Sequence, residues 1–137
     1  MRRLSLVRIL VVDRYAQFRE VVRSILEGKP GLQVVGEAAD GSGAVRKAEE
    51  LRPDLVILDI DLCELDRLEV AQQIRRLSPR SKILCLSQHD SPVLAQQALS
   101  TGAHGYVVKW RAARELEVAV HAAVADDLTG EHRRSVS

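Results

Sequence analysis

The sequence predicts a doubly wound α/β fold, in which a five-stranded parallel sheet carries helices on both faces. Five short runs of apolar and β-branched residues recur along the chain, and segments with helical periodicity lie between them. Runs that are apolar throughout suit strands buried on both faces, as in a parallel sheet. The strict alternation of strand and helix gives a series of βα units, which build a sheet of this kind.

The five expected strands are short and end in polar residues. They are "RILVVD" (8–13), "QVVGEA" (33–38), "DLVILDI" (54–60), "KILCLS" (82–87) and "GYVVK" (105–109). Segments with helical periodicity lie between and after them at 15–28, 42–53, 68–79, 91–103 and 111–124, and Pro53 and Pro79 end the second and third helices. "DGSGAV" (40–45) matches no phosphate-binding loop pattern and indicates a turn at the start of a helix.

Apolar stripes and capping residues support each helix. Gly28 supplies a C-cap for the first helix, and Ser91 with Pro92 forms an N-terminal signal for the fourth. The expected core stripes are Phe18, Val21, Val22, Ile25 and Leu26 in the first helix, Leu68, Ala71, Ile74 and Leu77 in the third, and Leu116, Val120 and Ala123 in the last.

Length and composition indicate one domain. The 137 residues suffice to bury a core, and 46% hydrophobic and 28% charged residues are ordinary for a globular protein. We expect a domain over residues 1–125 and a flexible C-terminal tail over 126–137, because the last residues are polar and lack periodicity. The net charge of +1 does not favour nucleic acid or an anionic membrane as a partner.

Cysteine usage and hydropathy bear on location. Cys63 and Cys85 make neither a metal-binding spacing nor a disulfide framework, which favours a reduced, cytoplasmic setting. No stretch approaches the roughly 18 apolar residues that a membrane-spanning helix needs. The expectation is therefore a cytoplasmic protein without a membrane partner.

Polar residues end four of the five expected strands. They are Asp13, Asp59 with Asp61, Ser87 and Lys109. In an open parallel sheet the ligand crevice lies at the carboxyl ends of the strands. Such a set suits a phosphoryl group, because an acid can be phosphorylated or hold Mg²⁺ while the hydroxyl and ammonium bind anionic oxygens. Strand ends are often polar for solvation alone, but complementary chemistry from four strands favours a site.

Five segments of the chain resemble the response-regulator receiver domain of two-component signalling. They are "ILVVDRYAQFREVVRSILE", "VVGEAADG", "PDLVILDIDL", "ILCLSQHD" and "TGAHGYVVK". The resemblance runs from about Val7 to Ala125 and is closest to receivers usually fused to a helix-turn-helix DNA-binding output. It implies a (βα)5 flavodoxin-like fold and a role in phosphorelay signal transduction.

The resemblance implies a role for each residue at the strand ends. Asp59 would be the phospho-acceptor, which takes a phosphoryl group from a histidine kinase or phosphotransfer protein and forms an aspartyl phosphate. Ser87 would hydrogen-bond a phosphoryl oxygen, and Lys109 would pair with the phosphate or with Asp59. Tyr106 would be the switch aromatic, which turns inward when the site is occupied.

The resemblance also implies a Mg²⁺ ion at Asp13, Asp59 and Asp61, with Asp61 contributing its backbone carbonyl. Receivers typically end the first strand in two adjacent acids, whereas Arg14 takes the second position here. A lost oxygen ligand and an added fixed charge predict a weak or absent Mg²⁺, with affinity lowered by about tenfold or more. The Asp61 carboxylate would compensate in part. Alternatively, Arg14 bridges Asp13 and Asp59 in place of the metal, or it points to solvent.

A second departure follows the expected acceptor. Receivers typically have Met-Pro three and four positions after that acid and Gly eight positions after it. Here these positions hold Leu62, Cys63 and Arg67. Gly serves where the backbone needs a positive φ or a close approach, so Arg67 predicts a strained or rebuilt loop.

The leading interpretation is a non-enzymatic receiver that meets a protein output partner or a second copy of itself. Its alternative is a phosphorylation-independent pseudo-receiver. In both versions the domain is an interaction module whose surface around the fourth helix, last strand and last helix meets the partner. A different class is a haloacid-dehalogenase-like metal-dependent phosphatase, because residues 59–61 form an Asp-x-Asp; that motif normally follows the first strand. Only a dozen residues follow Ala125, so we expect no DNA binding by this chain.

Overall fold

A computed structural model describes the backbone of residues 6–62 and 68–136 and the side chains of residues 6–61 and 68–125. Cys63 and Arg67, and with them the predicted rebuilt loop, lie outside the described residues. The described strands form one parallel sheet in the order β2-β1-β3-β4-β5. They are β1 (Val7–Val12), β2 (Leu32–Ala38), β3 (Leu55–Asp59), β4 (Lys82–Ser87) and β5 (Gly105–Val108). The predicted sheet is confirmed, and each strand end lies within one residue of its expected place.

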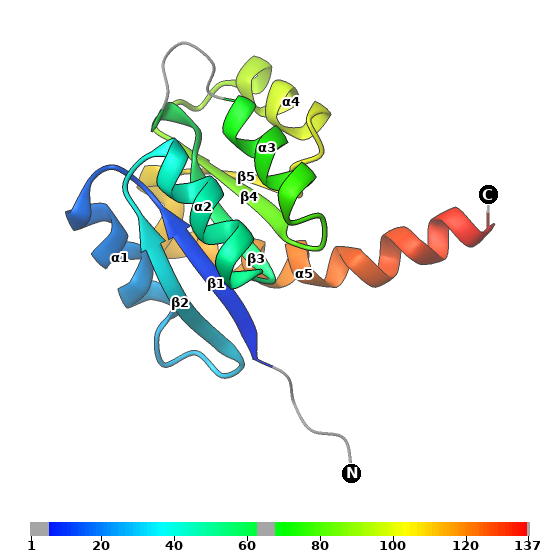
Figure 1. Cartoon of the computed structure of the whole chain (residues 1–137), viewed down its shortest axis with the longest axis horizontal. Helices are drawn as coiled ribbons and strands as arrows, with labels where there is room; N and C mark the ends of the chain where they lie inside the picture. The colour runs from blue at the N-terminus through cyan, green and yellow to red at the C-terminus, as the bar shows by residue number, and fades with distance from the viewer. Residues whose placement is uncertain (1–5, 63–67, 137) are drawn as a thin grey trace.

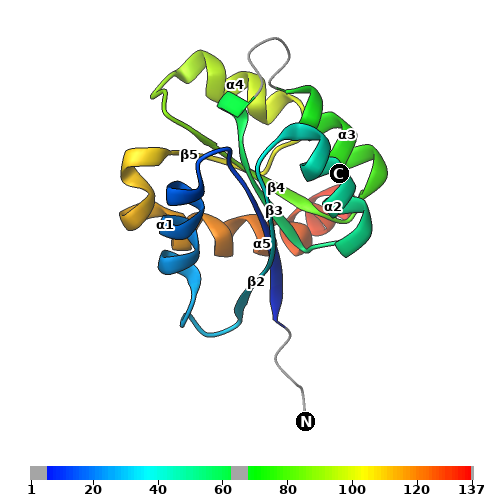
Figure 2. The ribbon, with the colours of Figure 1, turned by 60° about the vertical axis from the view of Figure 1, so that its left-hand side comes forward.

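Helices cover both faces of the sheet, as predicted (Figures 1 and 2). They are α1 (Ala16–Leu26), α2 (Gly41–Leu51), α3 (Glu69–Leu77), α4 (Pro92–Ser100) and α5 (Ala112–Val136), with short 3-10 turns η1 (Ile60–Leu62) and η2 (Lys109–Arg111). One core cluster packs α1 and α5 against the sheet, and the other packs α2, α3 and α4 against its opposite face.

Alternating residues along a strand contribute their side chains to the two core clusters. In β1, Leu10 and Val12 face α2, α3 and α4, while Ile9 and Val11 face α1 and α5. All four side chains are 0% exposed. A slip of one residue would exchange the two sets, so the apolar pattern helps to set the register of the strand ends.

The predicted helix signals agree with the structure at two helix starts, whereas the C-cap of α1 is Glu27 and the predicted Gly28 lies one residue beyond it. The Ser91 hydroxyl accepts a hydrogen bond from the Leu94 N–H at 3.1 Å, with Pro92 at the first helical position. The Asp40 carboxylate caps α2 by accepting from the Gly43 N–H at 2.7 Å, and Gly28 after α1 has φ of +84°. The stripe of α1 is narrower than predicted, because Val21 is 44% exposed.

The last helix is longer than predicted. Leu116, Val120 and Ala123 are buried as expected, but helical backbone continues to Val136 where we expected a tail from residue 126. The expected helix therefore ends too early, whereas the flexibility of residues 126–137 stays a prediction. Figure 1 shows the end of α5 extending away from the sheet. Within the described part of the chain, no helix is long and apolar enough to cross a membrane.

Two valines on α5 offer a matched test of the core. Val120→Ala should lower the free energy of unfolding by about 2 kcal/mol, because Val120 is 0% exposed and its loss leaves a cavity. Val118→Ala is the control, because Val118 is 71% exposed and both changes share the same gain in helix propensity. Urea denaturation measures both; equal effects would show that α5 does not pack as described.

Candidate functional site

The register of three neighbouring strands brings the predicted residues to one edge of the sheet. Val12 of β1 pairs with Leu58 of β3, so Asp13 and Asp59 follow at the same level. The Asp13 N–H extends the ladder by donating to the Ala38 carbonyl at 3.0 Å. These strands are neighbours although β2 separates them in sequence, so the strand order reverses here. Ligands of doubly wound sheets bind at such a reversal.

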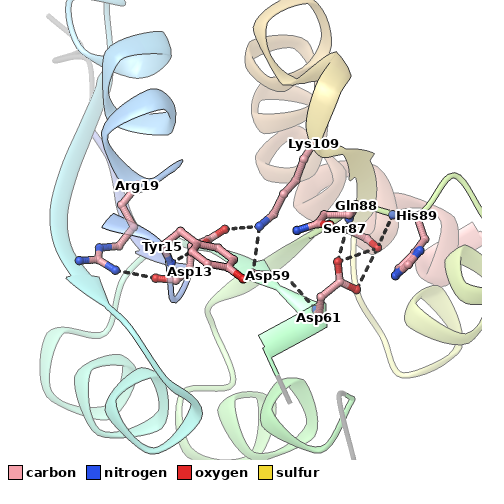
Figure 3. Close-up of polar contacts among 9 residues, drawn as sticks. All are labelled: Asp13, Tyr15, Arg19, Asp59, Asp61, Ser87, Gln88, His89 and Lys109. Carbon is pink, nitrogen blue, oxygen red and sulfur yellow. Dashed lines mark hydrogen bonds and ion pairs between the residues drawn. The ribbon is translucent and has the colours of Figure 1, made fainter. Parts of the chain in front are cut away.

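The two acids share one cation. Lys109 begins η2, directly after β5, and its Nζ lies 2.6 Å from Asp13 Oδ2 and 3.2 Å from Asp59 Oδ2 (Figure 3). The Asp13 side chain is 0% exposed, that of Asp59 2% and that of Lys109 9%. Among the described residues, Asp13 Oδ2 is buried without a hydrogen bond of good geometry, so the Lys109 ammonium is its electrostatic partner.

Burial changes the acidity of Asp59. Desolvation raises the pKa of Asp59, and Lys109 opposes that rise while the Asp13 charge adds to it. The Asp61 N–H donates to Asp59 Oδ1 at 2.9 Å, which favours the ionised carboxylate. Asp59 is therefore a carboxylate held in a low-dielectric setting beside a single cation.

Side chains of α1 and the loop before it line this edge. The Lys109 ammonium lies 4.6 Å from the Phe18 ring centroid and 5.8 Å from that of Tyr15, within the range of cation–π attraction. Arg19 donates to the Asp13 carbonyl at 2.6 Å and to Glu37 Oε1 at 2.8 Å. The Arg19 contacts tie the end of β1 to α1 and β2, and the two rings lie against the Lys109 ammonium.

A second cluster of hydrogen-bonded polar residues lies on the other side of Asp59. The Asp61 carboxylate accepts from the Ser87 hydroxyl at 3.1 Å and 3.2 Å and from the Gln88 N–H at 2.7 Å (Figure 3). Ser87, the last residue of β4, is 0% exposed. Its Oγ accepts from the His89 N–H at 3.0 Å, and the His89 carbonyl accepts from the Tyr106 hydroxyl at 2.6 Å.

Tyr106 lies in β5 and packs, partly buried, against the core under α2, α3 and α4. Desolvation raises the pKa of its hydroxyl, which therefore stays a hydrogen-bond donor. Cys85, in contrast, is an unreactive strand residue, since burial raises the pKa of its thiol to about 12.

Arg14 does not bridge the acids. Its side chain is exposed, its guanidinium carbon lies 5.1 Å from the Tyr15 ring centroid, and the ion pairs of Asp13 and Asp59 are made by Lys109. The alternative in which Arg14 replaces the metal is therefore wrong for this structure. The exposed placement weakens the argument from repulsion, but the missing oxygen ligand remains.

The metal-ligand set converges only in part. Asp13 Oδ2 and Asp59 Oδ2 both face Lys109, whereas the Asp61 carboxylate turns to Ser87. No group of three or more acids, histidines or cysteines that could hold a metal occurs among the described residues. Mg²⁺ commonly binds through one or two carboxylates and several waters, so Asp13 and Asp59 fit this ion with few protein ligands.

The chain matches the family described as response regulator receiver domain over residues 9–121, which is most of its length. The chain belongs to this family. Receiver domains of this family act in two-component signalling and generally bind Mg²⁺ at their phosphorylation site. The match leaves the haloacid-dehalogenase-like phosphatase without support.

Similar proteins include regulators that are longer than this receiver domain. The chain is 33% identical to the transcriptional regulatory protein DegU of Brevibacillus brevis over 141 aligned positions, covering 96% of the chain and 60% of DegU. It is 32% identical to the response regulator protein VraR of Staphylococcus aureus, covering 83% of the chain and 54% of VraR. The receiver domain thus spans about half the length of these curated relatives.

Solved receiver domains share the fold. The signal receiver domain of NarL from Mycobacterium tuberculosis matches with a TM-score of 0.81 and 33% identity over 88% of this chain and 98% of that one. A LuxR-family two-component response regulator from Aurantimonas sp. SI85-9A1 matches with a TM-score of 0.82 and 36% identity over 89% and 87%. The (βα)5 flavodoxin-like expectation is therefore confirmed.

Sequence reasoning missed several groups at the site. Tyr15, Phe18 and Arg19 support Lys109 and Asp13, and the Gln88 N–H binds Asp61. Tyr15 and Phe18 follow the strand-end acid Asp13 closely in the sequence, and this proximity was the signal that could have pointed to them. The backbone donors left no signal, because every residue type except Pro carries an N–H.

Asp59→Asn should raise the free energy of unfolding at pH 7 by more than the roughly 0.5 kcal/mol typical of surface substitutions. Burial raises the pKa of Asp59, so its ionised form costs stability above that raised pKa. This cost disappears as the pH falls below the pKa of the unfolded chain, where both states hold a neutral acid. The advantage of asparagine should therefore shrink in acid, measured by denaturation at several pH values.

Asp90→Asn is the control for this experiment, because Asp90 is 52% exposed and pairs with Arg111 at the surface. It should change stability by less than about 1 kcal/mol. A loss of stability in Asp59→Asn at pH 7 would show that the Lys109 ion pair outweighs the cost of burial.

Proposed function

We propose that this receiver domain accepts a phosphoryl group at Asp59 in a phosphorelay. The observation that carries the proposal is the convergence of Asp59, Asp13 and Lys109 at the point where the strand order reverses. Asp59 supplies a nucleophilic oxygen, and Lys109 supplies a cation for the oxygens that arrive with phosphorus. Ser87, on the next strand, supplies a hydroxyl donor.

The transfer is a displacement at phosphorus. A carboxylate oxygen of Asp59 forms a bond to phosphorus while the bond from phosphorus to the donor breaks, and the donor keeps the electron pair. With a phosphohistidine that leaving atom is an imidazole nitrogen, and with acetyl phosphate it is an acetate oxygen. Asp59 must be ionised to attack, which the Lys109 ammonium and the Asp61 N–H both favour.

Mg²⁺ would be held weakly by Asp13 and Asp59, with the Asp61 backbone carbonyl as the third protein ligand that family resemblance implies. The ion supplies positive charge to the phosphoryl oxygens when it is bound. Asp13 and Asp59 already pair with Lys109, and Arg14 stands where a second acid would add an oxygen ligand. A protein with fewer carboxylates at this edge should need more Mg²⁺ for the same occupancy.

The partners follow from the family role. A histidine kinase or phosphotransfer protein would supply the phosphoryl group, and a protein output partner or a second copy of this domain would read the result. Tyr106 would act as the switch aromatic, since its hydroxyl bonds the loop that follows Ser87. Location in the cytoplasm and lack of DNA binding by this chain stay predictions.

A second candidate is a pseudo-receiver that works without phosphate. The observation in its favour is the Asp61 carboxylate, which already occupies the Ser87 hydroxyl. Mass spectrometry after treatment with acetyl phosphate and Mg²⁺ separates the two: the phosphorelay proposal expects a gain of one phosphoryl group on Asp59 and none in Asp59→Asn. An unlabelled wild type under saturating donor and Mg²⁺ would favour the pseudo-receiver.

Arg14→Asp should lower the Mg²⁺ concentration for half-maximal labelling of Asp59 by about tenfold, because it adds an oxygen ligand and removes a positive charge. Lys109→Ala should reduce labelling at every Mg²⁺ concentration, because the phosphoryl oxygens lose their ammonium partner. The measurement is the initial rate of acetyl phosphate labelling against Mg²⁺ concentration.

Arg76→Asp is the matched control, because Arg76 is exposed on α3 and the substitution makes the same change of charge. An equal shift in this control would assign the effect to net charge. If wild type saturates at low Mg²⁺ and Arg14→Asp changes nothing, Arg14 has no bearing on the metal.

A further inference from the structure

The Asp61 carboxylate occupies a small anion-binding seat formed by the Ser87 hydroxyl and the Gln88 N–H. Both of its oxygens lie within hydrogen-bond distance of Ser87 Oγ, at 3.1 Å and 3.2 Å, and Oδ2 also accepts from Gln88 at 2.7 Å (Figure 3). Hydrogen bonds to an ionised acceptor are roughly twice as strong as neutral ones. The seat is therefore filled by an anion of the chain itself.

A phosphoryl group on Asp59 would need the same donor. A serine hydroxyl has one proton, so Ser87 cannot donate to Asp61 and to a phosphoryl oxygen at once. A phosphoryl group also carries a charge of about −1.5 to −2, which repels a neighbouring carboxylate. Two anions thus compete for one seat.

The seat connects to the surface of the domain. Ser87 Oγ accepts from the His89 N–H at 3.0 Å while it donates to Asp61, and the His89 carbonyl accepts from the Tyr106 hydroxyl at 2.6 Å. The anion in the seat therefore orders residues 87–89, which lead into α4. Asp61 holds this loop as a bound anion would.

We propose that Asp61 is an internal ligand of the phosphoryl-binding donors, which holds the loop after β4 in an anion-bound arrangement and must leave before a phosphoryl group on Asp59 can bind Ser87. The inference rests on the proposed function for the identity of the competing anion. It predicts that this receiver is slow to accept phosphate and that its loop is ordered without phosphate.

The first test follows amide hydrogen exchange in the unphosphorylated protein. In Asp61→Ala, the Gln88 N–H loses its acceptor and should exchange at least about tenfold faster, and His89 should change with it. Asp90→Ala removes an acid from the same loop without emptying the seat, so it should leave Gln88 unchanged. Unchanged exchange of Gln88 and His89 in Asp61→Ala would overturn the proposal.

The second test compares labelling of Asp59 by acetyl phosphate at saturating Mg²⁺. Asp61→Ala should be labelled about tenfold or more faster than wild type, because a charge-assisted contact no longer has to break. Asp61→Asn should be intermediate, because its amide oxygen can still accept but carries no charge. Equal rates in wild type and Asp61→Ala, or an equal gain in Asp90→Ala, would overturn the proposal.

A third measurement separates this inference from the proposed function. Inorganic phosphate is titrated into wild type and Asp61→Ala, and binding is followed on the Gln88 amide resonance. The vacated seat in Asp61→Ala should bind phosphate more tightly than wild type. If no variant is labelled at Asp59, the proposed function fails, and hydrogen exchange together with this titration decides the inference: tighter binding supports it, and equal binding overturns it.

Discussion

The Lys109 ammonium between Asp13 and Asp59 is the contact on which the rest of the site depends. Two carboxylates buried side by side repel each other, and burial raises the pKa of Asp59. Removing Lys109 would leave both buried charges without compensation, and breaking a buried ion pair in this way typically costs about 3–5 kcal/mol. The packing of β1, β3 and β5 and the rings of Tyr15 and Phe18 therefore all serve to keep one cation in place.

This constraint divides the polar strand ends into two groups. On one side of the site Lys109 offsets part of the charge of the two acids, while on the other the Asp61 carboxylate accepts from the Ser87 and Gln88 donors. An arriving phosphoryl group disturbs both groups, since it attracts the cation and competes for the donors. Phosphorylation at Asp59 would thus be an exchange of partners, and the chain of bonds through His89 to Tyr106 would carry that exchange towards α4.

The ion pairs of Lys109 also affect metal binding. A divalent cation at Asp13 and Asp59 competes with Lys109 for two oxygens that are already paired. An additional acid after β1 would give the ion an oxygen that Lys109 does not hold, but Arg14 occupies that position and lies against Tyr15 instead. Arg14 therefore weakens Mg²⁺ binding more through the missing oxygen ligand than through repulsion, because water screens the charge of an exposed guanidinium.

The sequence alone determined the order in which strands and helices follow one another along the chain, and the set of polar residues at the strand ends. Short apolar runs such as "LVILD" suit strands buried on both faces, and the polar residue at the end of each strand then lies at the carboxyl edge. Ser91 was likewise predicted as a cap, because a cap depends on neighbours within three residues. Local patterns of this kind need no knowledge of distant parts of the chain.

Only the tertiary structure decided how those polar residues pair. Asp61 binds donors 26 and 27 positions away. Arg14 is exposed, while Lys109, directly after β5, joins the acids. The apolar pattern also could not predict where α5 ends, because residues 126–136 carry no apolar stripe that indicates a helix. The strand register decides which charged side chains meet in a buried site and form ion pairs there. That register is set by the packing of the whole sheet rather than by any one segment.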